Sequence, residues 1–166
     1  SEISNYLIPH PIIKKISFTG STAVGKQLAS LAAQHMKLST MELGGHAPAI
    51  VFNDADLETA LDVLTTQKFR NAGQVCVAPT RFLVQENLYE QFVDGYTKRA
   101  NKVKLGNGLD SDTTMGPLAH DRRLAAVEEL VEDAVSQGAK VHSGGHRTGN
   151  IGYFYPPTVM TNVPIS

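Results

Sequence analysis

The sequence has a single cysteine, no excess of charge of either sign and no long apolar run. One cysteine cannot form an internal disulfide, so a reducing, cytoplasm-like compartment is expected. A formal net charge of −1, with acidic and basic residues interspersed, gives no electrostatic footprint for nucleic acid or for an anionic membrane surface. No apolar run is long enough to span a bilayer, and no signal-peptide pattern is present. These features predict neither a nucleic-acid partner nor a membrane partner.

The composition is that of a globular chain. A hydrophobic content of 42% over 166 residues is enough to bury the core of one ordinary domain, or of parts of two. The chain begins at Ser1 without an initiator methionine and stops at Ser166 without a helix or a charged tail. We therefore expect it to be a piece of a longer protein.

Apolar, β-branched runs alternate with amphipathic helical patterns along the whole chain. Strands are expected at 12–18, 38–43, 48–52, 81–84, 140–142 and 154–160, and helices at 23–35, 57–69, 87–103 and 122–137. Alternation of this kind predicts an α/β architecture with a largely parallel sheet.

The only cysteine, Cys76, lies in a stretch of small and flexible residues. Gly73 leaves room for a reactant, and Pro79 ends any helix that begins upstream. Arg70 and Arg81 add positive charge, which favours a thiolate over a thiol. The stretch suits a catalytic nucleophile, and the alternative from these residues alone is a small, buried structural cysteine.

A strand, a glycine-bearing turn and a helix follow one another around Gly20 and Ser21. Backbone N–H groups at such a helix start, together with the helix dipole, favour a bound phosphate. The alternative is an ordinary serine cap.

The stretch from Gly20 to Lys26 also fits the spacing G-x-x-x-x-G-K of a nucleotide-hydrolase P-loop, and Asp54 follows a short apolar run as a candidate magnesium ligand. However, Gln27 stands where that motif needs a Ser or Thr hydroxyl to hold Mg²⁺. A strand-to-helix turn of this kind also suits a dinucleotide pyrophosphate, which needs no metal clamp. The P-loop interpretation stays as an alternative.

Glu42 stands near the end of the expected strand 38–43, just before Gly44 and Gly45. This spacing presents a carboxylate at a strand terminus, where sites form in α/β proteins, and the alternative is a solvated glutamate in a turn. No metal site is expected, because a glycine-bearing segment separates His142 from His146 and would place both in loops.

Three ordered motifs resemble those of the aldehyde dehydrogenase superfamily. They are FTGST at 18–22, MELGG at 41–45 and GQVC at 73–76. MGPL at 115–118 and YFYPPTV at 153–159 extend the resemblance over nearly the whole chain. The segment KFRNAGQ at 68–74 most resembles the succinate-semialdehyde dehydrogenases.

The resemblance implies the aldehyde dehydrogenase fold. Residues 1–44 would form the C-terminal part of a Rossmann-like NAD(P)-binding domain, and residues 45–166 a truncated catalytic domain. The early cofactor strands, the oxyanion-hole asparagine, the later cofactor-binding glutamate and the oligomerisation hairpin would lie outside the chain. The full-length enzyme would be a homo-oligomer, either a dimer or a tetramer, and the piece alone would be inactive.

The resemblance also implies the chemistry. Cys76 would attack an aldehyde, hydride would leave for a nicotinamide, and Glu42 would activate the water that hydrolyses the resulting thioester. Arg70 would pair with the carboxylate of a semialdehyde such as succinate semialdehyde. The alternative for Arg70 is an exposed helix arginine paired with Asp62 or Glu58.

The implied cofactor is NAD or NADP. Gly20 and Ser21 would hold the pyrophosphate, and Leu43 and Gly44 would lie against the nicotinamide. None of these contacts distinguishes NAD from NADP. A non-catalytic pseudoenzyme fragment remains a third alternative, beside the dehydrogenase and the P-loop protein.

Overall fold

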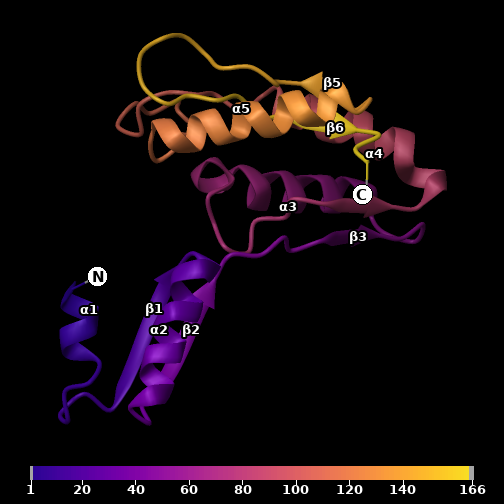
Figure 1. The fold of residues 1–166 in the computed structure, drawn as a ribbon. Coiled ribbons are helices and arrows are strands. Elements are labelled where there is room, and N and C mark those ends of the chain that lie inside the picture. The colour runs from indigo at the N-terminus through magenta and orange to yellow at the C-terminus, as the bar shows by residue number, and fades with distance from the viewer. Residues whose placement is uncertain (1, 165–166) are drawn as a thin grey trace. The chain divides into compact units, whose positions relative to one another are not determined.

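The computed structural model describes residues 2–164 (Figure 1). Ser1, Ile165 and Ser166 lie outside the described residues. The expectation about how the chain begins and ends falls on these residues. The chain divides into two compact units, one up to His46 and one from Ala47 onward, and each is described by itself.

The first unit contains two helices and one parallel strand pair. Its elements are α1 (Glu2–Leu7), β1 (Lys15–Gly20), α2 (Thr22–Gln34) and β2 (Leu38–Leu43). β1 and β2 pair in register from Lys15 opposite Leu38 to Gly20 opposite Leu43, and α2 connects them. The sequence analysis did not predict α1, a helix of six residues in which no residue is buried.

Close packing of α2 on β2 depends on a glycine. A Cβ added at Gly25 would lie 2.6 Å from Leu43 Cδ2, so any larger residue would push the helix away from the strand. Ala32, further along α2, is completely buried. Small residues on one face of α2 therefore set the helix directly against the sheet.

The second unit contains the remaining elements (Figure 1). They are β3 (Ala49–Val51), α3 (Leu57–Phe69), a 3₁₀ segment (Arg70–Gly73), β4 (Phe82–Val84), α4 (Glu86–Ala100), α5 (Asp121–Ser136), β5 (Lys140–Ser143) and β6 (Val159–Thr161). β3 pairs with β4 in parallel, whereas β5 pairs with β6 in antiparallel orientation with an irregularity between Val141 and Ser143.

Helices α3 and α4 pack together around an aromatic core. Phe92 and Tyr96 stack with ring centroids 5.5 Å apart, and Phe82 from β4 lies 5.0 Å from Tyr96. Leu61, 1% exposed, fills the space on the α3 side. Each such side chain stabilises the unit by about 1.5–3 kcal/mol when it leaves water. A smaller cluster joins Leu118, Leu124 and Tyr155, and the half-buried Ala72 packs against both clusters.

The α/β class with parallel strand pairs is confirmed, and the helix expected at 57–69 has the observed bounds of α3. The described residues form three two-stranded sheets, of which β1–β2 and β3–β4 are parallel and β5–β6 is antiparallel. The strand expected at 154–160 shrinks to Val159–Thr161. Pro156 and Pro157 lack the N–H groups that a sheet ladder needs.

Within residues 2–164, no helix has both the length and the apolar character that crossing a bilayer requires.

Candidate functional site

One group of the expected site residues lies at the carboxyl ends of β1 and β2. Gly20 stands opposite Leu43, and Glu42 stands opposite Thr19. Glu42 is exposed, whereas Leu43 is half-buried and contacts the position where Gly25 would carry a side chain. Alternation along the strand thus turns Leu43 toward α2 and Glu42 away from it.

Ser21 caps the start of α2. Its backbone is extended, with φ −70° and ψ 147°, and its Oγ accepts a hydrogen bond from the Val24 N–H at 3.4 Å. The serine-cap interpretation is therefore confirmed. The cap also leaves the hydroxyl proton of Ser21 available, at the positive end of a thirteen-residue helix.

The P-loop interpretation does not survive this geometry. In a P-loop, the residues between the first glycine and the G-K pair form a loop around the phosphates. Here the helix begins at Thr22, and the Gly25 N–H already donates to the Ser21 carbonyl at 2.9 Å, so Lys26 sits inside α2. Asp54 belongs to the other unit, in the turn before α3.

The same edge suits a dinucleotide better. A Cβ added at Gly44 would meet no atom within 4 Å, so the backbone just beyond β2 is open to a flat ring. The start of α2 offers backbone N–H groups and the Ser21 hydroxyl to a pyrophosphate. Donors and open backbone lie together at one end of a parallel strand pair, where α/β proteins bind nucleotides.

In the second unit, the backbone becomes left-handed just after the end of α3. Arg70 departs from the helix with φ −55° and ψ 130°. Asn71 and Ala72 then adopt left-handed backbone with φ of 51° and 53°, and Gly73 follows with φ of 74°. Left-handed backbone costs an ordinary L residue such as Ala72 about 1–2 kcal/mol. The surrounding contacts must hold this segment in place.

Gln74 supplies several of those contacts. Its backbone N–H and its Nε2 both donate to the Asn71 carbonyl, at 3.0 Å and 3.1 Å. In return, Asn71 Nδ2 donates to the Gln74 carbonyl at 3.3 Å. The Ala119 N–H donates to Gln74 Oε1 at 2.9 Å, and Nε2 also reaches the Pro117 carbonyl at 3.4 Å. One side chain thus ties the left-handed segment to a segment more than forty residues further along the chain.

Cys76 follows in a tight turn. The Ala78 N–H donates to the Val75 carbonyl at 2.9 Å, which places Cys76 at the first central position of that turn. Cys76 is an exposed free thiol, so the alternative of a buried structural cysteine was wrong. Ala78, 2% exposed, and the buried Pro79 anchor the chain immediately after it.

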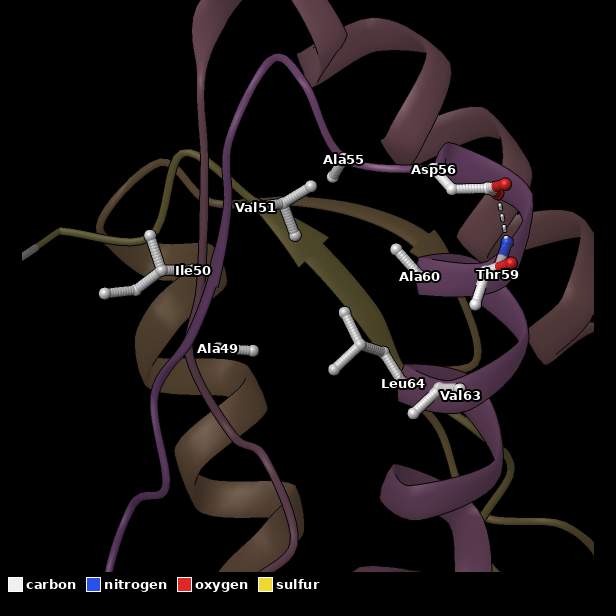
Figure 2. A pocket seen from close by; sticks show the side chains of 9 residues that line it. All are labelled: Ala49, Ile50, Val51, Ala55, Asp56, Thr59, Ala60, Val63 and Leu64. Carbon is white, nitrogen blue, oxygen red and sulfur yellow. Dashed lines mark hydrogen bonds between the residues drawn. The ribbon is translucent and has the colours of Figure 1, made fainter.

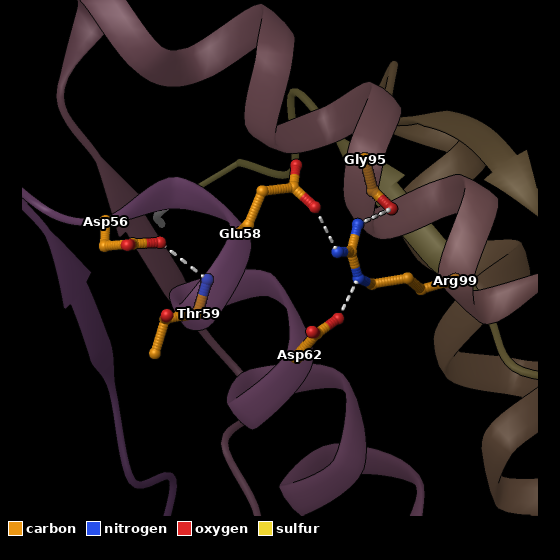
Figure 3. Close-up of polar contacts among 6 residues, drawn as sticks. All are labelled: Asp56, Glu58, Thr59, Asp62, Gly95 and Arg99. Atoms are coloured by element: carbon orange, nitrogen blue, oxygen red, sulfur yellow. Dashed lines mark hydrogen bonds and ion pairs between the residues drawn. The ribbon is translucent and has the colours of Figure 1, made fainter.

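Arg70 lies just beyond the end of α3, at the start of the 3₁₀ segment. Its alternative pairing with Asp62 or Glu58 was wrong, because both carboxylates bind Arg99 of α4 (Figure 3). Arg70 is exposed and borders a hollow of about 300 Å³. The other residues lining it are Thr65, Thr66, Phe69, Val103 and Thr114.

Lys68 is a neighbour of the cysteine loop that the sequence did not single out. Its Nζ would lie 3.4 Å from a Cβ placed on Gly73, so the ammonium packs against the left-handed segment. Burial lowers the pKa of Lys68, because the charged form loses water there. Nothing in the local sequence pattern predicts the burial of Lys68, because its contact with Gly73 depends on the left-handed backbone that follows α3.

An apolar hollow of about 440 Å³ lies between β3 and α3 (Figure 2). Its only charged lining residue is Asp56, whose Oδ1 accepts a hydrogen bond from the Thr59 N–H at 2.9 Å. This capping bond holds the pKa of Asp56 below its ordinary value. Cys76 does not line this hollow.

The prediction that His142 and His146 both lie in loops was correct for only one of them. His142 lies in β5 and not in a loop, with Nε2 2.8 Å from Thr161 Oγ1. His146 lies beyond the strand. Across residues 2–164, no three His, Cys, Asp or Glu side chains come together as potential metal ligands.

Comparison with known proteins decides the family. The model of the aldehyde dehydrogenase family matches residues 1–166. The chain belongs to the aldehyde dehydrogenase family. Among curated relatives, an NADP(+) succinate-semialdehyde dehydrogenase of Escherichia coli is 43% identical over 162 residues, with 98% of this chain and 34% of the relative covered.

A 4-(hydroxymethyl)benzenesulfonate dehydrogenase of Comamonas testosteroni is 44% identical over 165 residues, covering 99% of this chain and 34% of the relative. The solved succinate-semialdehyde dehydrogenase of Burkholderia pseudomallei superposes with a TM-score of 0.94 at 42% identity, covering 98% of this chain and 34% of that one. This aldehyde dehydrogenase chain therefore spans about a third of the length of the relatives that it matches.

Proposed function

We propose that the full-length protein containing this chain oxidises an aldehyde to a carboxylic acid with NAD or NADP, through a thioester on Cys76. The observation that carries the proposal is the exposed free thiol of Cys76 in a turn anchored on both sides. Membership of the aldehyde dehydrogenase family supports it. The 166-residue chain by itself is proposed to be inactive.

Cys76 performs the first step. Its thiolate sulfur bonds to the aldehyde carbon, and the carbonyl electron pair moves to the oxygen as an oxyanion. The Cys76 backbone N–H stabilises that oxyanion together with a group outside this chain. The oxyanion then collapses to a carbonyl as the hydride leaves, which yields a thioester. A nicotinamide held against Leu43 and Gly44 would supply the acceptor for this hydride.

Glu42 performs the second step in this proposal. Its carboxylate takes a proton from water, the water oxygen attacks the thioester carbon, and the Cys76 sulfur leaves as a thiolate. The product is the free carboxylic acid. Glu42 suits this role because it is exposed at the carboxyl end of β2 and has no ion-pair partner among residues 2–164.

The cofactor is assigned to the same strand edge. Gly20 and Ser21 hold the pyrophosphate at the start of α2, and Leu43 and Gly44 lie against the nicotinamide. The E. coli relative is named for NADP(+). Contacts with the pyrophosphate do not depend on whether the distal ribose carries a phosphate, so the proposal covers both NAD and NADP.

The substrate is an aldehyde with an anionic group remote from its carbonyl. Succinate semialdehyde carries a carboxylate at its far end, and the 4-(hydroxymethyl)benzenesulfonate named for the C. testosteroni relative, although an alcohol, carries a sulfonate. Arg70 is exposed beside a hollow, free of the acids on α3, and its guanidinium can pair with either anion. We therefore assign Arg70 to the distal anion, with succinate semialdehyde as the leading candidate.

The remaining proposals concern the protein's setting. A single free thiol fits a reducing, cytoplasm-like compartment. The full-length protein is proposed to form a homo-oligomer, a dimer or a tetramer, and to act on small molecules without a nucleic-acid or membrane partner. Its oligomeric state is measured by sedimentation of the full-length protein.

The deciding experiment uses the full-length protein and follows NAD(P)H formation with succinate semialdehyde. Cys76→Ser should abolish turnover and leave NAD(P) affinity near normal, because the hydroxyl is a much weaker nucleophile than a thiolate. Val77→Ser, an exposed neighbour in the same turn, is the matched control and should retain turnover. Retained turnover in Cys76→Ser would reject the assignment.

A further inference from the structure

In the part of the chain that the structure describes, the Cys76 side chain forms no hydrogen bond or ion pair that would anchor it. Cys76 is exposed, and the hydrogen bond that closes its turn joins Val75 and Ala78. The direction of its sulfur is therefore set by how the chain enters and leaves the turn. Downstream, Ala78 and Pro79 are buried and fix the exit.

The entry to the turn consists of the left-handed residues Asn71, Ala72 and Gly73. Such a backbone persists only where surrounding contacts determine it. Packing contributes through Ala72, which touches both hydrophobic clusters. Hydrogen bonding contributes mainly through Gln74, the last residue before the turn.

Both the nitrogen and the oxygen of the Gln74 side-chain amide form hydrogen bonds. Nε2 donates to the carbonyls of Asn71 and Pro117, and Oε1 accepts from the Ala119 N–H. Pro117 and Ala119 flank Leu118, which is 7% exposed in the smaller hydrophobic cluster. The Gln74 side chain thus connects the entry of the cysteine turn to a buried part of the same unit.

We propose that Gln74 is a positioning residue for Cys76, which holds the sulfur in the direction needed for attack on the aldehyde. This inference rests on the proposed function of Cys76. Loss of the Gln74 bonds leaves the thiol present and exposed but lets the turn rotate. An error of about 1 Å in the position of a reacting group can cost about 100-fold in rate.

The test uses the full-length protein with Gln74→Met, which keeps the length of the side chain and removes its three side-chain hydrogen bonds. The first-turnover burst of NAD(P)H should slow by about 10- to 100-fold. The KM for aldehyde and the affinity for NAD(P) should stay within about twofold, because neither ligand contacts Gln74 in this proposal. Alkylation of Cys76 by iodoacetamide should also stay within about twofold, since the thiol remains exposed.

The matched control is Gln67→Met, the same change at an exposed position of α3. It should leave the burst unchanged. Gln74→Glu provides a second variant, because its carboxylate retains the acceptor for Ala119 and loses the donor to the Asn71 and Pro117 carbonyls. An intermediate burst rate in Gln74→Glu supports the proposal.

The outcomes separate this inference from the proposed function. If the parent oxidises no aldehyde, the proposed function itself fails. If the parent is active and Gln74→Met bursts at the parental rate, Gln74 does not position the thiol. If burst rate, KM and unfolding temperature all change in proportion, or if neither variant folds, the role of Gln74 is in folding and the positioning proposal is overturned.

Discussion

Arg99 on α4 and Asp62 on α3 form an ion pair, with Arg99 Nε 2.6 Å from Asp62 Oδ1 (Figure 3). Glu58, one turn earlier on α3, binds Arg99 Nη2 at 2.7 Å. The hydrogen bonds that Arg99 donates to Asp62 and Glu58 raise the pKa of its guanidinium. Both acids that could have neutralised Arg70 are thus engaged elsewhere, and Arg70 has no ion-pair partner in the part of the chain that the structure describes.

Substitution of Arg70 should therefore affect substrate choice more than stability. In the full-length protein, Arg70→Ala should lower kcat/KM for succinate semialdehyde by about 10- to 100-fold, the loss of a charge-assisted contact of about 1.5–3 kcal/mol. An uncharged aldehyde of similar length should be oxidised with unchanged kcat/KM. Steady-state kinetics on both substrates gives the comparison.

Arg122→Ala is the matched control for this change, because Arg122 is an exposed arginine in the first turn of α5. It should leave both substrates unaffected. Equal losses on the two substrates in Arg70→Ala, or no loss on either, would remove the assignment of Arg70 to the distal anion. The family assignment would stand, because it rests on the whole chain.

Much of the fold follows from local signals that the sequence displays. The helix 57–69 has a capping aspartate, Asp56, and ends where the observed helix ends. The strand 38–43 agrees with β2 because its apolar pattern and the following glycines mark both ends. Such elements depend on neighbours in the sequence, which a reader of the sequence can see.

The candidate site was harder to predict, because its details depend on distant contacts. Left-handed backbone at Ala72 contradicts local preference and is stable only through Gln74 and the clusters on either side. Gln74 belongs to the GQVC motif, but the motif does not show that its side chain binds Pro117 and Ala119. Likewise, the pairing of Asp62 with Arg99 depends on how α3 and α4 pack, which charge patterns within one helix do not reveal.

Substitution of Glu42 should separate the two halves of the proposed reaction. In the full-length protein, Glu42→Gln should still form the thioester but hydrolyse it slowly, because the amide cannot accept a proton from water. Mass spectrometry after mixing with aldehyde and NAD(P) should then detect an acyl group on Cys76. Glu129→Gln, an exposed change on α5, should show no adduct. Parental turnover without an adduct in Glu42→Gln would mean that another base acts.

Tyr96 offers a test of the core. Its hydroxyl is buried with no hydrogen-bond partner among the described residues, and burial raises its pKa. Tyr96→Phe removes this unpaired group and keeps the stacked ring, so it should leave the protein equally stable or up to about 1 kcal/mol more stable. Tyr96→Ala removes the ring as well and should cost about 3–5 kcal/mol. Thermal unfolding measures both, and clear destabilisation by Tyr96→Phe would show that the hydroxyl has a partner.

The isolated 166-residue chain should show no aldehyde-dependent NAD(P)H formation, only weak dinucleotide affinity and a tendency to associate with itself. Within residues 2–164, β1 pairs only with β2 and β3 only with β4, so each sheet has unpaired edges. Ile50 and Leu83 stand opposite each other on the β3–β4 pair, and both are at least half exposed. Exposed apolar residues on an unpaired sheet favour association.

Sedimentation of the isolated chain should therefore show concentration-dependent association. The double change Ile50→Lys and Leu83→Lys should reduce it, because charges on an edge oppose strand pairing. Lys substitution at Leu109, an exposed apolar residue in a loop, is the matched control and should leave the association unchanged. A monomer at all concentrations would contradict the prediction of association. Sustained NAD(P)H production by the isolated chain would overturn its proposed inactivity if the rate were comparable with that of the full-length protein. The groups that complete the oxyanion site and the cofactor site would then have to lie within these 166 residues.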